Sequence, residues 1–499
     1  MNISKLFVLI SFINFVLVSL VSANSGIWIT QSEINSLPTS GSAYNNVLNQ
    51  ANQAACTPIL SNQDDSCNVK VLAQALVFAK TRNEQYRTKV VSAITSIVNS
   101  GTYNGRALAL GRELAAYVIS ADLIDLSTFN SNLNNQFRSK ITELRTTPTT
   151  DGPSNLINCH EDRPNNWGTH CGATRAAIAA YLNDQTELNR IAQVFKGWLG
   201  DRSSYSGFGY GDLSWQCNSN QPVGINPLGC TIQGHTVDGV LPDDQRRGGG
   251  FTWPPPKENY VWEALQGATV QAELLYRKGH DAWGWQNQAL KRSLIWLHTN
   301  HFLPSGNEPY PADGDDTWIP HLVNFAYNTN FQEVIPTSPG KNMGWTDWSH
   351  SGTRSPQQTC SDGTPYNTCS TNQPLYCNNG VLENRCSQCL CPNGYDCQAN
   401  QSCTAHVNQA PVATITQPTQ TVYTVNTPIN YAGSATDPED INIPASSLCW
   451  SYDITGDTQG YINLGCRSSG TFTPTVIINN QPTNYLLRLN ATDTQGASG

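Results

Sequence analysis

The sequence predicts a secreted, multidomain chain: an α/α toroid of helices, a small disulfide-rich module, and a C-terminal all-β, Ig-like sandwich. Three observations support this. Apolar residues recur every three or four positions from about residue 26 to 350, eight cysteines lie between 360 and 403, and short β-rich runs follow residue 410. The expected boundaries are 1–23 for a signal peptide, 24–355 for the toroid, 356–405 for the cysteine-rich module and 406–499 for the sandwich.

The first 23 residues have the pattern of a signal peptide. A basic start at Lys5 precedes an apolar run at 6–20, and VSA at 21–23 fits the small-residue cleavage pattern. The apolar run is shorter than the roughly 20 residues that a membrane-spanning helix needs. We therefore expect cleavage near Asn24, an extracellular location, and no membrane span in the mature chain.

Helical periodicity is clearest in five segments of the toroid region: 70–81, 106–126, 173–182, 261–279 and 287–302. Long loops rich in Gly, Asn, Pro, Trp and Tyr separate them, and loops of such length in a compact domain are often functional. Serial antiparallel helix pairs joined by these loops predict a toroid with a cleft at one end.

The sixteen cysteines fall into even groups, with six at 56–230, eight at 360–403 and two near the C-terminus. Even groups predict that each region closes its own disulfides, as in an oxidising compartment. A zinc site at Cys386, Cys389 and Cys391 is the alternative, which the ligand spacing disfavours. Proximity in sequence predicts the pairs Cys56–Cys67, Cys159–Cys171, Cys217–Cys230 and Cys449–Cys466.

The runs VATITQP, QTVYTV and NYLLRLNATD after residue 410 are typical of a β-sandwich, and the pattern predicts a further strand beyond the last residue. Asp437, Glu439 and Asp440 form either an acidic turn or a calcium site, and we favour the turn. Asn400 and Asn490 lie in glycosylation sequons, which permit attachment.

The net charge of −9, with 13% charged residues, offers no basic field for nucleic acid, so we expect no nucleic-acid partner. An acidic polymer would need a local basic cleft. Candidates for that cleft are Arg163, Arg175, Arg246, Arg247 and Lys257, with ordinary surface charge as the alternative for Arg175 and Lys257.

The first motif is RPNNWGTHCGATRAAIAAYL at 163–182, where two asparagines, a tryptophan and a histidine precede a helix. One asparagine is expected to cap the helix. The other, which we take to be Asn166, would donate a hydrogen bond to a sugar carboxylate, while Trp167 offers an aromatic face to the ring. Such polar density in a disulfide-closed loop is typical of a functional site.

The second motif is DGVLPDDQRRGGGFTWPPPKENYVWEALQGAT at 238–269, in which paired arginines precede a tyrosine at the start of a helix. Further aromatic and polar residues lie in this motif and in the loop at 308–331. Some tryptophans are expected in the core and others along sugar subsites. The candidate substrate-binding residues are Asn165, Trp167, Arg163, Trp253, Trp262, Trp318 and His321.

The order NNW, DG-x-LP, paired arginines and NY resembles the alginate lyase family, whose toroid members carry an NNH-type motif, a DG-x-LP stretch, an arginine and a catalytic tyrosine at a helix start. The resemblance covers about 150–350. It implies β-elimination on a uronate polymer without a cofactor, with Asn166 and either Arg246 or Arg247 neutralising the carboxylate and Tyr260 transferring the proton.

The chain departs from the family at Trp167, which stands where the family has histidine. The resemblance therefore leaves His170 and His235 as the candidate catalytic histidines. Elimination builds negative charge beside an existing carboxylate, so strong donors must neutralise that group. An unperturbed tyrosine has a pKa of about 10, and a nearby arginine favours its anionic form.

Two other functions remain open. A glycoside hydrolase on a similar toroid would use two carboxylates, about 5 Å apart if retaining and about 6.5 to 9.5 Å apart if inverting. A non-catalytic glycan-binding protein would instead rely on the C-terminal regions. In each case we expect a monomer. The candidate carboxylates are Asp243, Asp244, Glu263, Asp315 and Asp316.

Overall fold

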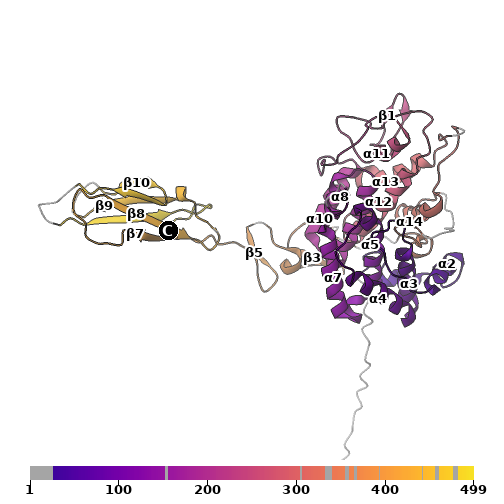
Figure 1. Cartoon of the computed structure of the whole chain (residues 1–499), viewed down its shortest axis with the longest axis horizontal. Helices are drawn as coiled ribbons and strands as arrows, with labels where there is room; N and C mark the ends of the chain where they lie inside the picture. Colours follow the sequence, from indigo (N-terminus) through magenta and orange to yellow (C-terminus); the bar gives the residue numbers. More distant parts are fainter. Residues whose placement is uncertain are drawn as a thin grey trace, which may run out of the picture. The chain divides into compact units, whose positions relative to one another are not determined.

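The computed structural model describes residues 26–499 apart from 152–154, 304–305, 332–339, 355–358, 363, 365–367, 393, 441, 456–459 and 476–481. The expected signal peptide lies outside the described residues. The chain divides into two compact units, Met1–Thr359 and Cys360–Gly499 (Figure 1). Among the described helices, none combines the length and apolar character needed to cross a bilayer.

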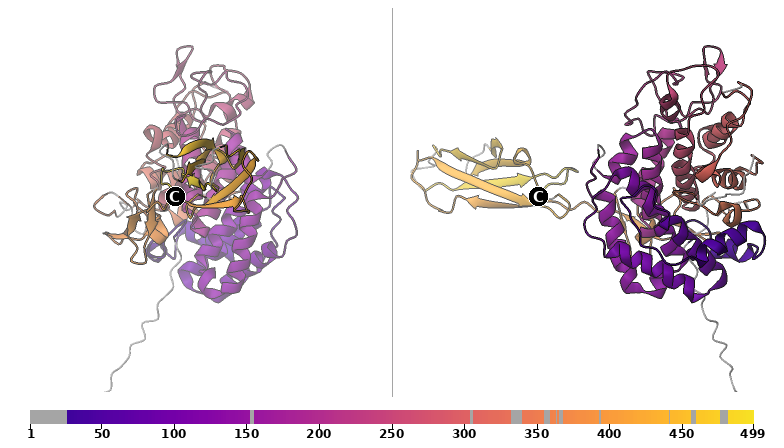
Figure 2. Two further views of the ribbon diagram at one scale, coloured as in Figure 1. Left: turned by 90° about the vertical axis from the view of Figure 1, so that its left-hand side faces the viewer. Right: turned by 45° about the vertical axis from the view of Figure 1, so that its right-hand side comes forward.

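The first unit is helical, and its helices gather into one body in both views of Figure 2. In chain order they are α1 (Gln31–Ser36), α2 (Ser42–Asn52), α3 (Cys67–Thr81), α4 (Glu84–Val98), α5 (Ala107–Leu123), α6 (Leu126–Phe129), α7 (Ser131–Thr146), α8 (Leu156–Asp162), α9 (Asn166–Leu182), α10 (Gln185–Leu199), α11 (Pro242–Gln245), α12 (Tyr260–Arg277), α13 (Trp285–Leu297), α14 (Ile319–Tyr327) and α15 (Thr346–Ser349). The short elements are β1 (Thr231–Ile232), β2 (His235–Thr236), η1 (Arg246–Gly248) and η2 (Gly314–Asp316).

Four helices, α3, α5, α9 and α12, form the buried centre of this unit. Every residue of α5 is buried, as are most residues of the other three. A helix that is apolar on all sides belongs in a core. They pack in chain order, α3 on α5, α5 on α9 and α9 on α12.

The buried helices run parallel, because residues near the start of each contact residues near the start of the next. Asn68 on α3 donates to the backbone oxygen of Arg112 on α5, at 3.5 Å. Asn166 on α9 contacts Glu263 on α12. The polar residues at these helix starts therefore collect at one end of the unit.

Helices α4 and α10 are amphipathic and cover the buried centre. On α4 the buried side chains follow the helical spacing, from Tyr86 through Val90 and Ala93 to Ile97. Three disulfides also hold this unit, and they are the pairs expected from sequence proximity: Cys56–Cys67, Cys159–Cys171 and Cys217–Cys230.

The second unit is β-rich and contains small sheets. Its elements are β3 (Leu375–Asn378), β4 (Val381–Asn384), α16 (Cys386–Cys389), β5 (Tyr395–Cys397), β6 (Cys403–Ala405), β7 (Val412–Gln417), β8 (Ile429–Thr436), η3 (Ala445–Ser447), β9 (Leu448–Ile454), β10 (Ile462–Cys466), β11 (Ser469–Phe472) and β12 (Tyr485–Ala491). Strands β3 with β4 and β5 with β6 form hairpins, and two three-stranded antiparallel sheets follow, ordered β10-β9-β12 and β11-β8-β7.

The two three-stranded sheets share one core, in which Tyr431 and Phe472 of one sheet meet Trp450 and Leu489 of the other. The expected pair Cys449–Cys466 joins β9 to β10. The run at 420–425, which has a strand-like composition, forms no strand. Prolines at 418 and 428 flank it, and proline cannot donate to a sheet ladder.

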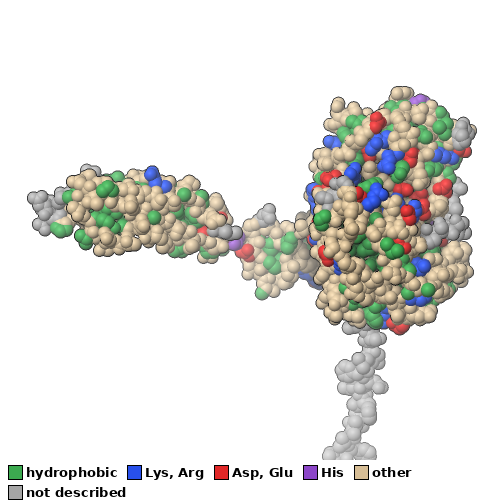
Figure 3. Space-filling view, viewed as in Figure 1, with side chains coloured by type: hydrophobic (Ala, Val, Ile, Leu, Met, Phe, Trp, Pro, Cys, Tyr) green, Lys and Arg blue, Asp and Glu red, His purple; other side chains and the backbone are tan. Residues whose placement is uncertain are grey.

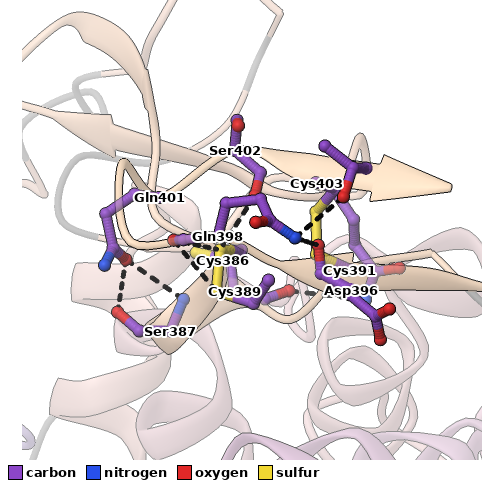
Figure 4. Close-up of a disulfide and its surroundings, with 12 residues drawn as sticks. Cys386, Ser387, Cys389, Cys391, Asp396, Gln398, Gln401, Ser402 and Cys403 are labelled. Carbon is purple, nitrogen blue, oxygen red and sulfur yellow. Dashed lines mark hydrogen bonds between the residues drawn. A yellow bond between two sulfur atoms is a disulfide. The ribbon is translucent and has the colours of Figure 1, made fainter. Parts of the chain in front are cut away.

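Disulfides take the place of an apolar core in the segment 360–403, which contains four bridges. Figure 4 shows the part of this segment around Cys386, Cys391 and Cys403. The sulfur atoms of Cys386, Cys391 and Cys397 lie within 4.8 Å of one another, but each belongs to a disulfide. Zinc needs thiolates, so this arrangement fits the disulfide interpretation. In the last part of the chain, Asp437 Oδ1 accepts from the backbone amides of Glu439 and Asp440, as in an acidic turn.

Candidate active site

The two asparagines at the start of α9 have different roles. Asn165 caps the helix, since its Oδ1 accepts from the backbone N–H of Trp167 at 3.2 Å. Its Nδ2 donates to Asp243 at 3.1 Å. Asn166 is fully buried; its backbone N–H donates to Asp244 at 3.0 Å and its Nδ2 donates to Glu263 Oε2 at 3.0 Å. Asn166 therefore connects the start of α9 to α12.

The start of α12 carries Tyr260 as its first residue and Glu263 one turn later. Arg112, from the second turn of α5, also donates to Glu263 Oε2. The side chain of Arg112 is 3% exposed and that of Glu263 is 15% exposed. The guanidinium carbon of Arg247 lies 3.8 Å from the centre of the Tyr260 ring. Thus Asn166, Tyr260 and Arg247, which the sequence singled out, lie around the Arg112–Glu263 ion pair.

Two further carboxyl groups are almost completely buried beside this pair. Burial raises the pKa of Asp244 well above its ordinary value, and the nearby carboxylates of Asp243 and Glu263 raise it further, against a hydrogen bond from Asn166. Burial likewise raises the pKa of Asp316, which accepts from Gln266 at 2.7 Å. Both groups therefore favour the neutral acid form, and the negative charge of the site is carried by other carboxylates.

The two arginines of the second motif are placed differently. Arg246 forms an ion pair with the buried Asp243, at 2.8 Å. The same Asp243 carboxylate also accepts the hydrogen bond from Asn165. Arg247 is exposed and lies against Tyr260. Of the two, Arg247 is the one available to a ligand. On the face shown in Figure 3, Lys and Arg side chains gather over the α11–α13 part of the unit, with Asp and Glu among them.

Two other basic residues of the expected cleft are committed to ion pairs. Arg175 is buried and pairs with Glu187 at 2.7 Å and Glu161 at 2.9 Å, so it is neither cleft nor surface charge. Lys257 pairs with Glu308 at 2.7 Å, and both side chains are about one-third exposed. A basic cleft would therefore rest on Arg247 and Arg163 rather than on the full set.

His170 and His235 were the candidate catalytic histidines, but no hydrogen bond or ring contact among the described residues joins either one to Asn166, Tyr260 or Glu263. His170 is fully buried, and its ring nitrogens have no hydrogen-bond partner within the described parts of the chain. Burial lowers its pKa well below the usual value, and the positive charges of Arg112 and Lys341 lower it further. A neutral ring without solvent contact cannot neutralise a substrate carboxylate. His235 lies in the β1–β2 hairpin and stacks on Trp253, with ring centres 4.3 Å apart.

The aromatic candidates also divide. Trp262 and Trp318 are 0% and 1% exposed, so both are core residues. They were predicted to bind substrate, but neither can stack on a sugar. Trp253 contacts His301 as well as His235, which leaves less of its ring for a ligand. Of the remaining candidates, His321 is half-buried on α14.

The guanidinium groups of two arginines lie over the ring of Trp167 at the start of α9. The guanidinium carbon of Arg106 is 4.7 Å from the indole and that of Arg163 is 5.6 Å away. The indole is half-buried. The ring and its two arginines form a polar, partly exposed surface near the buried Asn166, and Arg106 also pairs with Asp151 at 3.4 Å.

Sequence reasoning missed Arg112 and Gln266, and it considered Glu263 only for a hydrolase. A signal for Arg112 was present: the pair Arg112–Glu113 interrupts the otherwise apolar first part of α5, from Ala107 to Ile119. Charged residues are almost never fully buried without a partner, so such a pair in a core helix points to a polar site. No protein-family model and no curated protein matches this chain.

Proposed function

We propose that the chain is a secreted polysaccharide lyase that cleaves an acidic, uronate-containing polymer such as alginate by β-elimination, with the active site at the starts of α9 and α12. The observation that carries the proposal is the contact of the Arg247 guanidinium with the Tyr260 ring, one helical turn from the Glu263 that Asn166 holds. A phenol beside a cation suits proton transfer near a carboxylate.

The chemistry follows from the charges at the site. Arg247 lies over the Tyr260 ring and is placed to attract the carboxylate of a uronate bound beside that ring. The same guanidinium, with the neutral form of the nearby buried Asp244 beside it, favours a negatively charged sugar acid over a neutral one. The disulfide Cys159–Cys171, whose cysteines flank the start of α9, holds this loop in place.

The finer architecture is part of the proposal. We infer an α/α toroid because the buried helices α3, α5, α9 and α12 pack in chain order and run parallel, with polar residues at their starts. We infer an Ig-like sandwich because two three-stranded sheets share one core and a disulfide. Eight disulfides among the described residues support an extracellular location.

A glycoside hydrolase is the second candidate. It is favoured by the three carboxyl groups of Asp244, Glu263 and Asp316, two of which have a raised pKa, as a general acid requires. Burial argues against this pair as catalysts, because Asp244 and Asp316 are each only 1% exposed. A hydrolase would need one of them to reach a glycosidic oxygen.

The test is a screen of uronate polymers for unsaturated products by ultraviolet absorbance, with wild type, Tyr260→Phe and Tyr276→Phe in parallel. Tyr276 is a matched control, since it lies on the same helix with the guanidinium carbon of Arg354 at 4.0 Å from its ring. We expect product with wild type and the control, and a loss of at least about 100-fold for Tyr260→Phe. New reducing ends without absorbance would instead identify a hydrolase, and binding without cleavage a glycan-binding protein.

A further inference from the structure

Among the described residues, the hydrogen bonds to the Glu263 carboxylate reach a single oxygen. Its Oε2 accepts from both Arg112 and Asn166. Within the described residues, no hydrogen bond reaches Oε1, although the side chain is 15% exposed. One oxygen is thus fixed by two donors while the other remains open to solvent. Such an arrangement orients a carboxylate without occupying its second oxygen.

Glu263 differs in this respect from the other carboxyl groups around it. Asp244 and Asp316 are 1% exposed, and burial raises the pKa of each well above its ordinary value. Asp243 is 2% exposed and already accepts from Arg246, Asn165 and the Gly211 amide. Of these four groups, Glu263 is the one that a sugar can reach.

The position of Glu263 relative to Tyr260 gives it a partner. Residues three apart on a helix lie on the same side, with Cβ atoms about 5–6 Å apart. Tyr260 and Glu263 therefore face the same space from one helix, with Arg247 beside the tyrosine. Two proton-transfer groups at this spacing can act on neighbouring atoms of one sugar residue.

We propose that Glu263 is a second catalytic residue, the base of a Glu263–Tyr260 pair, and this rests on the lyase function proposed above. Glu263 Oε1 takes the C5 proton of the uronate, and that electron pair forms the C4–C5 double bond. The bond from C4 to the bridging oxygen breaks, and the leaving oxygen takes the proton of the Tyr260 phenol. A proton passed from Glu263 to Tyr260 through water then restores both groups.

Arg112 and Asn166 act as positioning residues in this arrangement. Arg112 balances the charge of Glu263, so an approaching uronate does not meet an uncompensated negative charge. Asn166 fixes the same oxygen from the opposite helix. Asn166 therefore acts through Glu263. The family resemblance had implied a different role, in which Asn166 neutralises the substrate carboxylate directly.

The experiment compares Glu263→Gln, Glu263→Asp and Tyr260→Phe on a uronate polymer and on a short uronate with nitrophenol as the leaving group at C4. A nitrophenolate leaves without a proton. We therefore expect Tyr260→Phe to regain activity on the short substrate, while Glu263→Gln stays at least about 100-fold below wild type on both, with KM little changed. Glu263→Asp, which keeps the charge beside Arg112 but withdraws the oxygen, should also be slow while remaining folded.

Glu308→Gln serves as the control for loss of a carboxylate, because Glu308 pairs with Lys257 at the surface. It should retain wild-type activity. Full activity of Glu263→Gln, or recovery of Glu263→Gln on the short substrate while Tyr260→Phe stays slow, would overturn the assignment of the base. If wild type gives no unsaturated product from any polymer, the lyase function itself fails, and this assignment fails with it.

Discussion

At the scale of single residues, the site depends on a division between two adjacent asparagines. Asn165 satisfies an amide at the start of α9, while Asn166 reaches across to α12. The sequence could predict that one of them caps the helix, because asparagine before an apolar helix is a common cap. It could not predict the partner of Asn166, since Glu263 is 97 residues away and only the packing of the helices brings it near.

The capping role of Asn165 gives the first prediction for stability. Asn165→Ala should lower the free energy of unfolding by about 1 kcal/mol, because the Trp167 amide loses its acceptor. Asn165→Ser should lose less, since serine is also a good cap. Urea unfolding followed by circular dichroism measures both. Equal losses for the two variants would mean that the hydrogen bond to Asp243, rather than the cap, carries the effect.

The limit of sequence reasoning at this scale is shown by the histidines. His170 lies about one helical turn after Asn166 and was a candidate catalytic histidine, but it is fully buried, with α5 and α12 packed against this part of α9. Whether a residue near a helix start points into a cleft or into a neighbouring helix depends on which helices pack there. That information is not local, so periodicity alone does not contain it.

At the scale of elements, the closeness of α9 and α12 positions Asn166 against Glu263. Gly267 on α12 makes this possible, because a Cβ at this position would clash with the backbone of Thr169 and His170. Gly111 on α5 has the same role toward α9, where a Cβ would meet Cys171 N at 2.9 Å. Backbone atoms cannot move aside as a flexible side chain can, so these glycines set the spacing of the three helices.

The close spacing of α9 and α12 predicts that a glycine-to-alanine substitution, which usually stabilises a helix, will be destabilising at Gly267. Glycine to alanine within a helix normally stabilises by roughly 0.5–1 kcal/mol. Gly267→Ala should instead destabilise the first unit by about 1–3 kcal/mol, because it overpacks the α9–α12 contact. Gly101→Ala, where no atom lies within 4 Å of an added Cβ, is the control and should be nearly neutral. Thermal unfolding of both variants measures the effect. A Gly267→Ala variant more stable than wild type would contradict the tight contact between α9 and α12.

The helices themselves were the more predictable elements. The segments 106–126 and 261–279 match α5 and α12 closely, because their apolar spacing is a local property. The segment 173–182 underestimated α9, which begins at Asn166. The stretch from Asn166 to Gly172 contains two glycines and several polar residues, so it lacks an apolar pattern although all of it except Trp167 is buried.

At the scale of the whole first unit, a buried cluster of charged side chains connects both ends of this unit to α12. Glu273 is fully buried and accepts from Arg277 at 2.7 Å, from Trp283 at 3.0 Å and from Arg354 near the end of the unit. Arg277 also pairs with Glu33 of α1 at 2.8 Å. The cluster thus joins the first helix, the α12 helix of the site and the last described segment of the unit.

The cluster predicts a pH dependence of stability. Burial alone would raise the pKa of Glu273, but Arg354 and Arg277 hold it at about 2, below its ordinary value of 4.5. A carboxyl group whose folded pKa is depressed stabilises the fold above its unfolded pKa, and that stability is lost as pH falls through the folded pKa. The shift corresponds to stability on the order of 3 kcal/mol at neutral pH, lost between about pH 4.5 and 2.

Glu273→Gln should therefore be less stable than wild type at pH 7, and the difference between them should shrink as pH falls from 4.5 toward 2. His350, 3.8 Å from Glu273, has its pKa lowered to about 4 by burial and titrates over an overlapping range. For this reason the difference between the two proteins, rather than either curve alone, is the quantity to measure by denaturant unfolding at each pH. A difference that stays constant down to pH 2 would show that Glu273 contributes through packing and not through its charge.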